Sequence, residues 1–193
     1  MSSREDILKS IRSSLPKETI DLPNTDIKHM QYADKNEQFA QVSRAVGGNA
    51  KWLEKQSIDA FIKENYKDAK VIVSTREDVT CQTREQKDIS NPRALEDVDL
   101  AVINGHFAVA ENGAVWVNEK NLRHRSLYFL ATQLLIIVKK ENIVHTMHEA
   151  YKKVNFNNNV YGVFISGPSK TADIEQALVI GAHGPTDACV LFV

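Results

Sequence analysis

The chain has 193 residues with 24 basic and 25 acidic side chains, a formal net charge of −1 at pH 7, and so lacks the overall field that attracts nucleic acid or anionic lipid. Hydrophobic residues make up 42% and charged residues 25%, which excludes the disordered and fibrous classes and predicts a folded globular domain. The two cysteines, Cys81 and Cys189, form no Cys-x-x-Cys pair, so this chain alone can assemble neither a disulfide framework nor a cysteine-ligated cluster.

Residues 1–35 are expected to form an amphipathic helix followed by an extended arm. A Ser-x-x-Glu capping box opens the helix, and apolar residues continue at helical spacing until Pro16. Prolines and the lack of a clear period predict the arm over residues 16–35, which leaves one main domain over residues 36–193. The N-terminus has no continuous apolar stretch, and apolar runs such as 134–138 are far too short to span a membrane, so we expect a cytoplasmic protein.

From residue 36 onward, short apolar segments alternate with helical patterns, which is typical of an α/β fold. Helices are expected at about 39–46, 57–66, 125–131, 142–154 and 171–180. Short β-branched runs predict strands at 71–73, 100–103, 107–110, 115–117, 134–138, 160–165 and 188–193. Single helices between strands indicate parallel βαβ units, whereas glycine-containing turns at 104–106 and 111–113 indicate hairpins. We therefore expect a mixed, largely parallel sheet.

The most informative segment covers residues 160–185 and is predicted to form a strand, a turn, a helix and a second turn. Its first turn is Ser166-Gly167-Pro168-Ser169-Lys170, and the helix is expected to start at Thr171. A helix N-terminus presents unpaired N–H groups and a partial positive charge, and a glycine lets the backbone approach a ligand. With hydroxyl and ammonium donors from Ser169, Lys170 and Thr171, this turn is a candidate site for phosphate or carboxylate.

A purely structural interpretation of the same turn is also open. Ser169 or Thr171 would then cap the helix, Pro168 would set its entry, and Asp173 and Glu175 would complement its dipole. A P-loop is excluded, because Pro168 stands where that motif requires lysine. A nucleotide triphosphatase is therefore not expected.

A second candidate is the turn Glu111-Asn112-Gly113 between two apolar strands. Loss of water around Glu111 could raise the pKa of its carboxyl group and make it a base or a nucleophile. The alternative is an ordinary hairpin turn with its glutamate facing water, because Asn-Gly is a strong hairpin signal.

Two further groups could contact an anion. His183, followed by Gly184, lies between glycines that could aim its imidazole at a pocket, although the preceding glycine could simply end the helix. Arg123 belongs to a small basic cluster that could clamp a carboxylate, or could pair with acids in a surface turn. A helix over 171–180 would be about 15 Å long and would separate Lys170 from His183, so either two sites exist or the chain bends back. No metal site is expected.

Taken together, the segments 107–113, 166–175 and 181–185 closely resemble the LUD domain of lactate-utilisation proteins, of the LutC/YkgG type. The resemblance implies a three-layer α/β/α fold similar to the NagB/RpiA/CoA-transferase-like group. It also implies a bacterial role in oxidising L-lactate to pyruvate together with iron–sulfur proteins of the LutA and LutB type. The cysteine runs of LutB-like proteins are absent here, so iron–sulfur clusters are expected only in those partners and no cofactor is expected in this chain.

The first hypothesis is a LutC-like component that binds a small carboxylate or phosphate, with Glu111 and His183 as candidate catalytic groups. The alternatives are a CoA-transferase-like enzyme with Glu111 as nucleophile, a sugar-phosphate isomerase with Glu111 as base, or a non-catalytic interaction subunit. Asn112 stands where many family members have threonine, which is expected to alter ligand preference. Whether the chain is an enzyme by itself or a homo-oligomer is left open.

Overall fold

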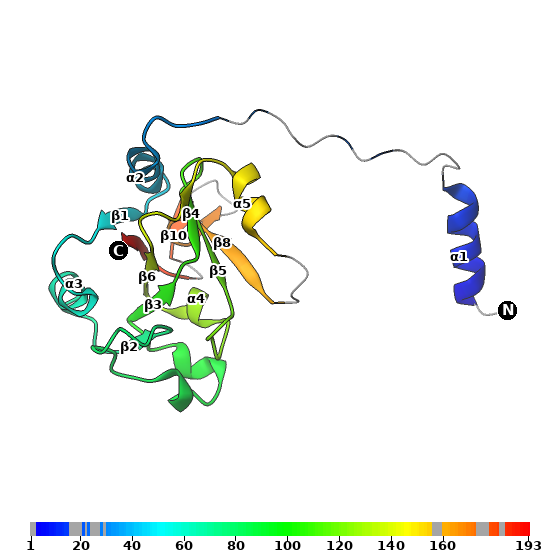
Figure 1. The fold of residues 1–193 in the computed structure, drawn as a ribbon. Helices are drawn as coiled ribbons and strands as arrows, with labels where there is room; N and C mark the ends of the chain where they lie inside the picture. The colour runs from blue at the N-terminus through cyan, green and yellow to red at the C-terminus, as the bar shows by residue number, and fades with distance from the viewer. Residues whose placement is uncertain are drawn as a thin grey trace.

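The computed structural model describes residues 3–15, 21, 23, 28, 30–155, 160–172, 178–181 and 184–193. The expected N-terminal helix is confirmed as α1 (Ser3–Ser14), which has no buried residue and lies apart from the rest of the chain (Figure 1). Most of the arm expected over 16–35 falls outside the described residues, so the domain boundary at residue 36 stays a prediction. Within the described part of the chain, no helix is long and apolar enough to cross a membrane.

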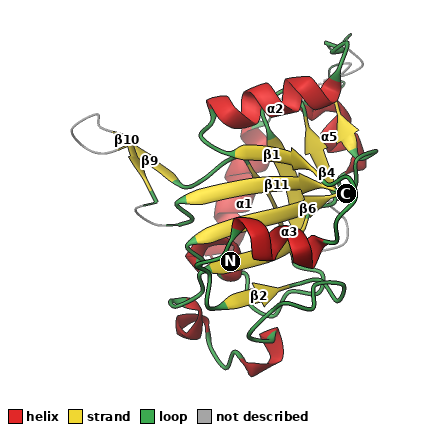
Figure 2. Ribbon diagram, turned by 90° about the vertical axis from the view of Figure 1, so that its left-hand side faces the viewer, coloured by secondary structure: helices red, strands yellow, loops and turns green. Residues whose placement is uncertain are grey.

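Five strands form an entirely parallel sheet in the order β1-β11-β6-β3-β2 (Figure 2). They are β1 (Asn49–Trp52), β2 (Ile72–Ser74), β3 (Leu100–Asn104), β6 (Gln133–Val138) and β11 (Asp187–Phe192). The apolar runs of β3, β6 and β11 are buried on both faces, which is why they contain almost no polar residues. The edge strand β1 has alternating exposed and half-buried residues and was missed by the sequence analysis.

A second sheet has the order β7-β4-β5-β8, with β7 (Ile143–Val144), β4 (Phe107–Val109), β5 (Ala114–Asn118) and β8 (Gly162–Ile165). The hairpin expected at 111–113 is confirmed, since β4 and β5 pair antiparallel across it. The hairpin expected at 104–106 is wrong, because β3 and β4 belong to different sheets. Gly105 makes this crossing, and the side chains of Val115 and Val138 leave no room for a Cβ there.

The two sheets pack face to face and enclose the largest apolar core. The helix α3 (Ile58–Asn65) covers the other face of the parallel sheet, where Phe61 and Ile62 pack against alternate residues of β3, β6 and β11. The helix α5 (Met147–Lys153) covers the outer face of the second sheet. The expected α/β class with a largely parallel sheet is confirmed, and the added finding is that the strands divide between two stacked sheets.

The helix expected over 171–180 is wrong, because the described residues at both ends of this segment form strands. Strands β9 (Lys170–Ala172) and β10 (Leu178–Ile180) pair antiparallel and form a hairpin that projects beyond the parallel sheet (Figure 2). The β-branched residues Thr171, Val179 and Ile180 favour extended backbone, which explains the preference for strands. Asp173 and Glu175, which were expected to complement a helix dipole, lie outside the described residues.

The remaining helices lie where the sequence predicts them, but their lengths differ from the expected ones. They are α2 (Lys35–Ala45), with Asp34 as its N-cap, and α4 (Leu127–Leu130). The helix expected over 142–154 is shorter, because Ile143 and Val144 pair with β4 before α5 begins. Short 3-10 turns, η1 (Gln86–Asp88) and η2 (Pro92–Leu95), cross the loop before β3.

Candidate functional site

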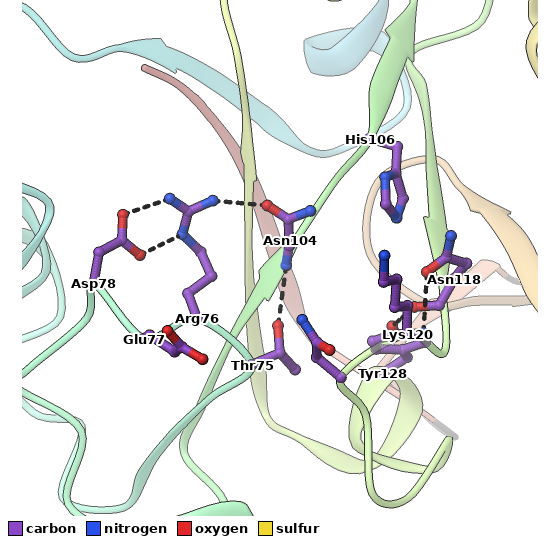
Figure 3. A pocket seen from close by; sticks show the side chains of 10 residues that line it. Thr75, Arg76, Glu77, Asp78, Asn104, His106, Asn118, Lys120 and Tyr128 are labelled. Atoms are coloured by element: carbon purple, nitrogen blue, oxygen red, sulfur yellow. Dashed lines mark hydrogen bonds and ion pairs between the residues drawn. The ribbon is translucent and has the colours of Figure 1, made fainter.

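A polar pocket with a volume of about 400 Å³ opens where β2 and β3 end (Figure 3). Open parallel α/β sheets bind ligands at the carboxyl ends of their strands, where strand-to-helix loops carry polar side chains. We call this the carboxyl-edge pocket. It is lined by Thr75, Arg76, Glu77, Asp78, Asn104, His106, Asn118, Lys120, Asn121 and Tyr128.

One wall of the pocket is held rigid by Arg76. Its Nε and Nη2 donate to both carboxylate oxygens of Asp78, at 2.8 and 2.5 Å, and its Nη1 donates to Asn104 Oδ1 at 2.7 Å. The backbone N–H of Asn104 donates to Thr75 Oγ1 at 3.2 Å. Because Asn104 Oδ1 is engaged by the guanidinium, its amide NH₂ group remains as a donor toward a ligand. Asp78 balances the charge of Arg76, so Arg76 chiefly positions Asn104.

The opposite wall comes from the second sheet and from the loop after β5. Asn118 accepts a hydrogen bond from the Lys120 backbone N–H at 3.0 Å, and its carbonyl accepts one from the Tyr128 hydroxyl at 2.7 Å. Burial raises the pKa of Tyr128 to about 12, so the phenol remains a donor at neutral pH. Among the residues that the structure describes, the side chains of His106 and Lys120 have no hydrogen-bond partner. A cationic donor and an imidazole therefore face this pocket uncommitted.

The neighbouring Glu119 is tied to the loop instead of the pocket. Its carboxylate forms an ion pair with Arg125 and accepts a hydrogen bond from the Tyr161 backbone N–H. The Arg125 guanidinium lowers the pKa of Glu119, so the carboxylate stays ionised. Glu119 thus fixes the loop that carries Lys120 while its charge is balanced locally.

The sequence-predicted turns lie at the opposite edge of the parallel sheet. The Ser166 hydroxyl donates to the Asn112 carbonyl at 2.8 Å, which joins the turn at 111–113 to the turn at 166–170. Gly113 and Gly167 contact the C-terminal end of α2, just before β1 begins. Both turns therefore lie at the amino edge of the parallel sheet, and we call the turns at 111–113 and 166–170 the amino-edge cluster.

The hairpin also brings the two halves of the 160–185 motif together. The Ser169 N–H donates to the Pro185 carbonyl at 2.9 Å, and the Gly181 N–H donates to the Ser169 carbonyl at 3.0 Å. Gly184 lies against the Ser169 side chain. The chain therefore bends back, one of the two arrangements left open by the sequence, while His183 itself lies outside the described residues.

The helix-based argument for anion binding at Lys170 is wrong, because a strand begins there. The nearest helix end is the C-terminus of α2, where the Lys170 side chain lies beside Gly47 and Gly167 and its Nζ is 3.5 Å from the Pro168 carbonyl oxygen. A helix C-terminus carries partial negative charge, which favours a lysine and opposes a bound anion. The backbone of Thr171 continues into β9. This geometry gives Lys170 a structural interaction, and an anion at this turn stays a prediction.

Glu111 and Arg123 also have structural contacts. The exposed Glu111 carboxylate accepts a hydrogen bond from the Met147 N–H at 2.7 Å, at the start of α5. The Arg123 backbone N–H donates to Gln86 Oε1 at 3.1 Å, in a loop away from the amino-edge cluster. Neither residue lines the carboxyl-edge pocket. Their catalytic or ligand-binding roles stay predictions.

Sequence analysis missed Thr75, Arg76, Asn104, His106 and Lys120. The first four lie within three residues of the ends of the expected strands 71–73 and 100–103, which is the signal that could have found them. No group of at least three His, Cys, Asp or Glu side chains within the described ranges is arranged to hold a metal ion.

The family model described as "LUD domain" matches residues 1–193. The chain belongs to the LUD domain family. Among curated proteins, it is 31% identical to "Lactate utilization protein C" of Bacillus pumilus over 121 residues, covering 60% of this chain and 50% of that protein. It is 33% identical to the protein of the same name from Bacillus subtilis over 110 residues, covering 53% and 45%. The chain spans about half the length of the curated relatives it matches.

The LUD fold is also seen in a solved structure. The crystal structure of a DUF162 family protein from Deinococcus radiodurans superposes with a TM-score of 0.68 and covers 86% of this chain and 99% of that one. Sequence identity is 15%, so this similarity establishes the shared α/β fold and nothing about ligands.

Proposed function

We propose that this LUD protein is a LutC-like component of bacterial lactate utilisation and binds a small carboxylate or phosphate in the carboxyl-edge pocket. The family membership and the relatives named "Lactate utilization protein C" support the pathway. The protein would act in the cytoplasm with iron–sulfur partners of the LutA and LutB type. Because its cysteines, Cys81 and Cys189, form no cluster-binding motif, electrons released when L-lactate becomes pyruvate would pass to those partners.

The observation that carries the binding proposal is the uncommitted Lys120 ammonium in a pocket of small-molecule size. A carboxylate or phosphate beside Lys120 would also accept hydrogen bonds from the Asn104 amide and the Thr75 hydroxyl across the pocket (Figure 3). His106 lies within the same lining and would exchange a proton with a ligand hydroxyl. The Arg76 ion pair would keep Asn104 in place without adding net charge.

Ligand binding is tested by thermal unfolding and calorimetry with L-lactate, pyruvate and inorganic phosphate. A bound ligand at 100 times its dissociation constant stabilises a protein by about 2.7 kcal/mol, which is easily measured as a rise in Tm. Lys120→Ala should abolish the rise, whereas Lys67→Ala, which removes an exposed lysine after α3, should leave it unchanged. Equal ligand-induced shifts in both variants would refute the proposed site.

The pathway role is tested separately in cells. Deletion of the gene should prevent growth on L-lactate, and expression of the wild-type chain should restore it. Restoration by Lys67→Ala but not by Lys120→Ala would connect the pocket to the pathway. Normal growth of the deletion strain on L-lactate would refute the pathway assignment, whatever the binding measurements show.

A further inference from the structure

A second pocket, with a volume of about 420 Å³, adjoins the carboxyl-edge pocket and shares His106, Asn118 and Lys120 with it. It continues onto the outer face of the second sheet, where Phe107 and Trp116 line it. We call it the aromatic pocket. Since His106, Asn118 and Lys120 line both spaces, a ligand held by Lys120 lies at the boundary between them.

The floor of the aromatic pocket is apolar and held rigid by packing. The ring centroid of Trp116 lies 4.7 Å from that of Phe164, and the ring centroid of Phe107 lies 6.1 Å from the same Phe164 centroid. The indole also lies against the Gly162 backbone, which leaves no space for a Cβ there. Trp116 is nevertheless only half-buried, so part of its ring faces the pocket. Such a surface suits a planar apolar group.

The charges at the rim favour an anion near Lys120 and an aromatic group beyond it. The only carboxylate lining this pocket within the described residues is Glu119, which is already paired with Arg125. Lys153 stands on the α5 side, with its Nζ 5.9 Å from the Phe107 ring centroid. An ammonium in that position can also lie over the ring of a bound ligand.

We infer that the preferred ligand is a 2-hydroxy or 2-oxo acid with an aromatic side chain, its carboxylate on Lys120 and its ring on Trp116. This inference rests on the proposed carboxylate site and names its substrate class. Lactate would occupy the carboxyl-edge pocket alone, and its methyl group would leave the aromatic pocket empty. A phenyl group in place of hydrogen on that methyl would occupy the apolar floor.

The test compares L-lactate with L-phenyllactate by calorimetry on the full chain. L-phenyllactate should bind about tenfold or more tightly, because the added ring is removed from water against aromatic side chains. It should also change the fluorescence of Trp116, which a Trp116→Phe variant would abolish. Trp52→Phe is the matched control, because Trp52 lies on β1 and stacks on Phe192 instead of lining either pocket.

Two variants test the role of the aromatic pocket. Trp116→Leu removes the flat floor, and Val160→Trp fills the exposed rim without touching the core. Both variants should lower the affinity for L-phenyllactate to the affinity for L-lactate, and both should leave L-lactate binding unchanged. Lys120→Ala should weaken the binding of both acids.

The outcomes separate this inference from the proposed function. Binding of L-lactate with no gain for L-phenyllactate would overturn the aromatic specificity and leave the carboxylate site standing. A gain that survives both Trp116→Leu and Val160→Trp would also overturn it. Failure of both acids to bind would refute the carboxylate site and this inference together.

Discussion

Substitution of Gly105 by alanine should destabilise the protein, because this residue carries the chain between the two stacked sheets. A Cβ at Gly105 would lie 2.6 Å from Val115 Cγ1, 2.7 Å from Val138 Cγ2 and 2.9 Å from Ile136 Cγ2. Favourable carbon–carbon contacts are about 3.5–4.0 Å, so the sheets would have to separate by up to about 1 Å. Overpacking of this kind costs about 1–3 kcal/mol, and each kcal/mol lowers the Tm of a domain this size by about 2–4 °C.

Urea and thermal unfolding of Gly105→Ala would measure this cost, with an expected fall in Tm of about 2–12 °C. Val115→Ala removes the nearest methyl groups and should make the double variant less unstable than the sum of the two single changes. A loss below about 0.5 kcal/mol for Gly105→Ala, or strict additivity in the double variant, would refute the packing argument.

Three other predictions follow from individual contacts. Burial raises the pKa of Cys189 to about 11, so its thiol should resist a disulfide reagent at pH 8 in native protein and react once urea unfolds it; equal rates would contradict this. Asp99→Ala removes the acceptor of two backbone N–H groups before β2, at 2.7 and 2.8 Å, and urea unfolding should show a loss of about 1–3 kcal/mol. Arg125 lowers the pKa of Glu119, so this ion pair stabilises the fold at pH values above the ordinary pKa of glutamate, and the stabilisation is lost as the pH falls and the carboxylate is protonated. The difference in unfolding free energy between the wild type and Glu119→Gln should therefore shrink from pH 7 to pH 3. A difference that stays constant with pH would contradict this.

The strands of the core were predictable because burial on both faces leaves a continuous apolar run. The segments 100–103, 134–138 and 188–193 all lie in the parallel sheet close to the expected positions. The division into two sheets was not predictable, because the turn at 104–106 has the residues of a hairpin. Only the tertiary packing around Gly105 shows that the chain changes sheets there.

The candidate site was harder to predict for a related reason. The single glycine, the single proline and the hydroxyl residues at 166–171 resemble a helix start. The chain from Lys170 onward instead pairs as strands, and the turn lies at the carbonyl end of α2. In contrast, Asn104, His106 and Lys120 form no compact motif and meet only because strands from both sheets end at one edge. The positions of Asn104 and His106 after an expected strand mark them as candidates, but spacing along the chain does not show that Lys120 meets them.

The order of strands in the parallel sheet also determines when this fold can close. Because β11 lies between β1 and β6, β1 has no partner in the sheet until residue 187 has been synthesised. Contacts between segments this far apart require closure of a long loop before they contribute energy, which slows folding. During translation, the unpaired edges of β1 and β6 are open to wrong strand partners. The strand β11 therefore protects both edges, and it can do so only after its own residues have left the ribosome.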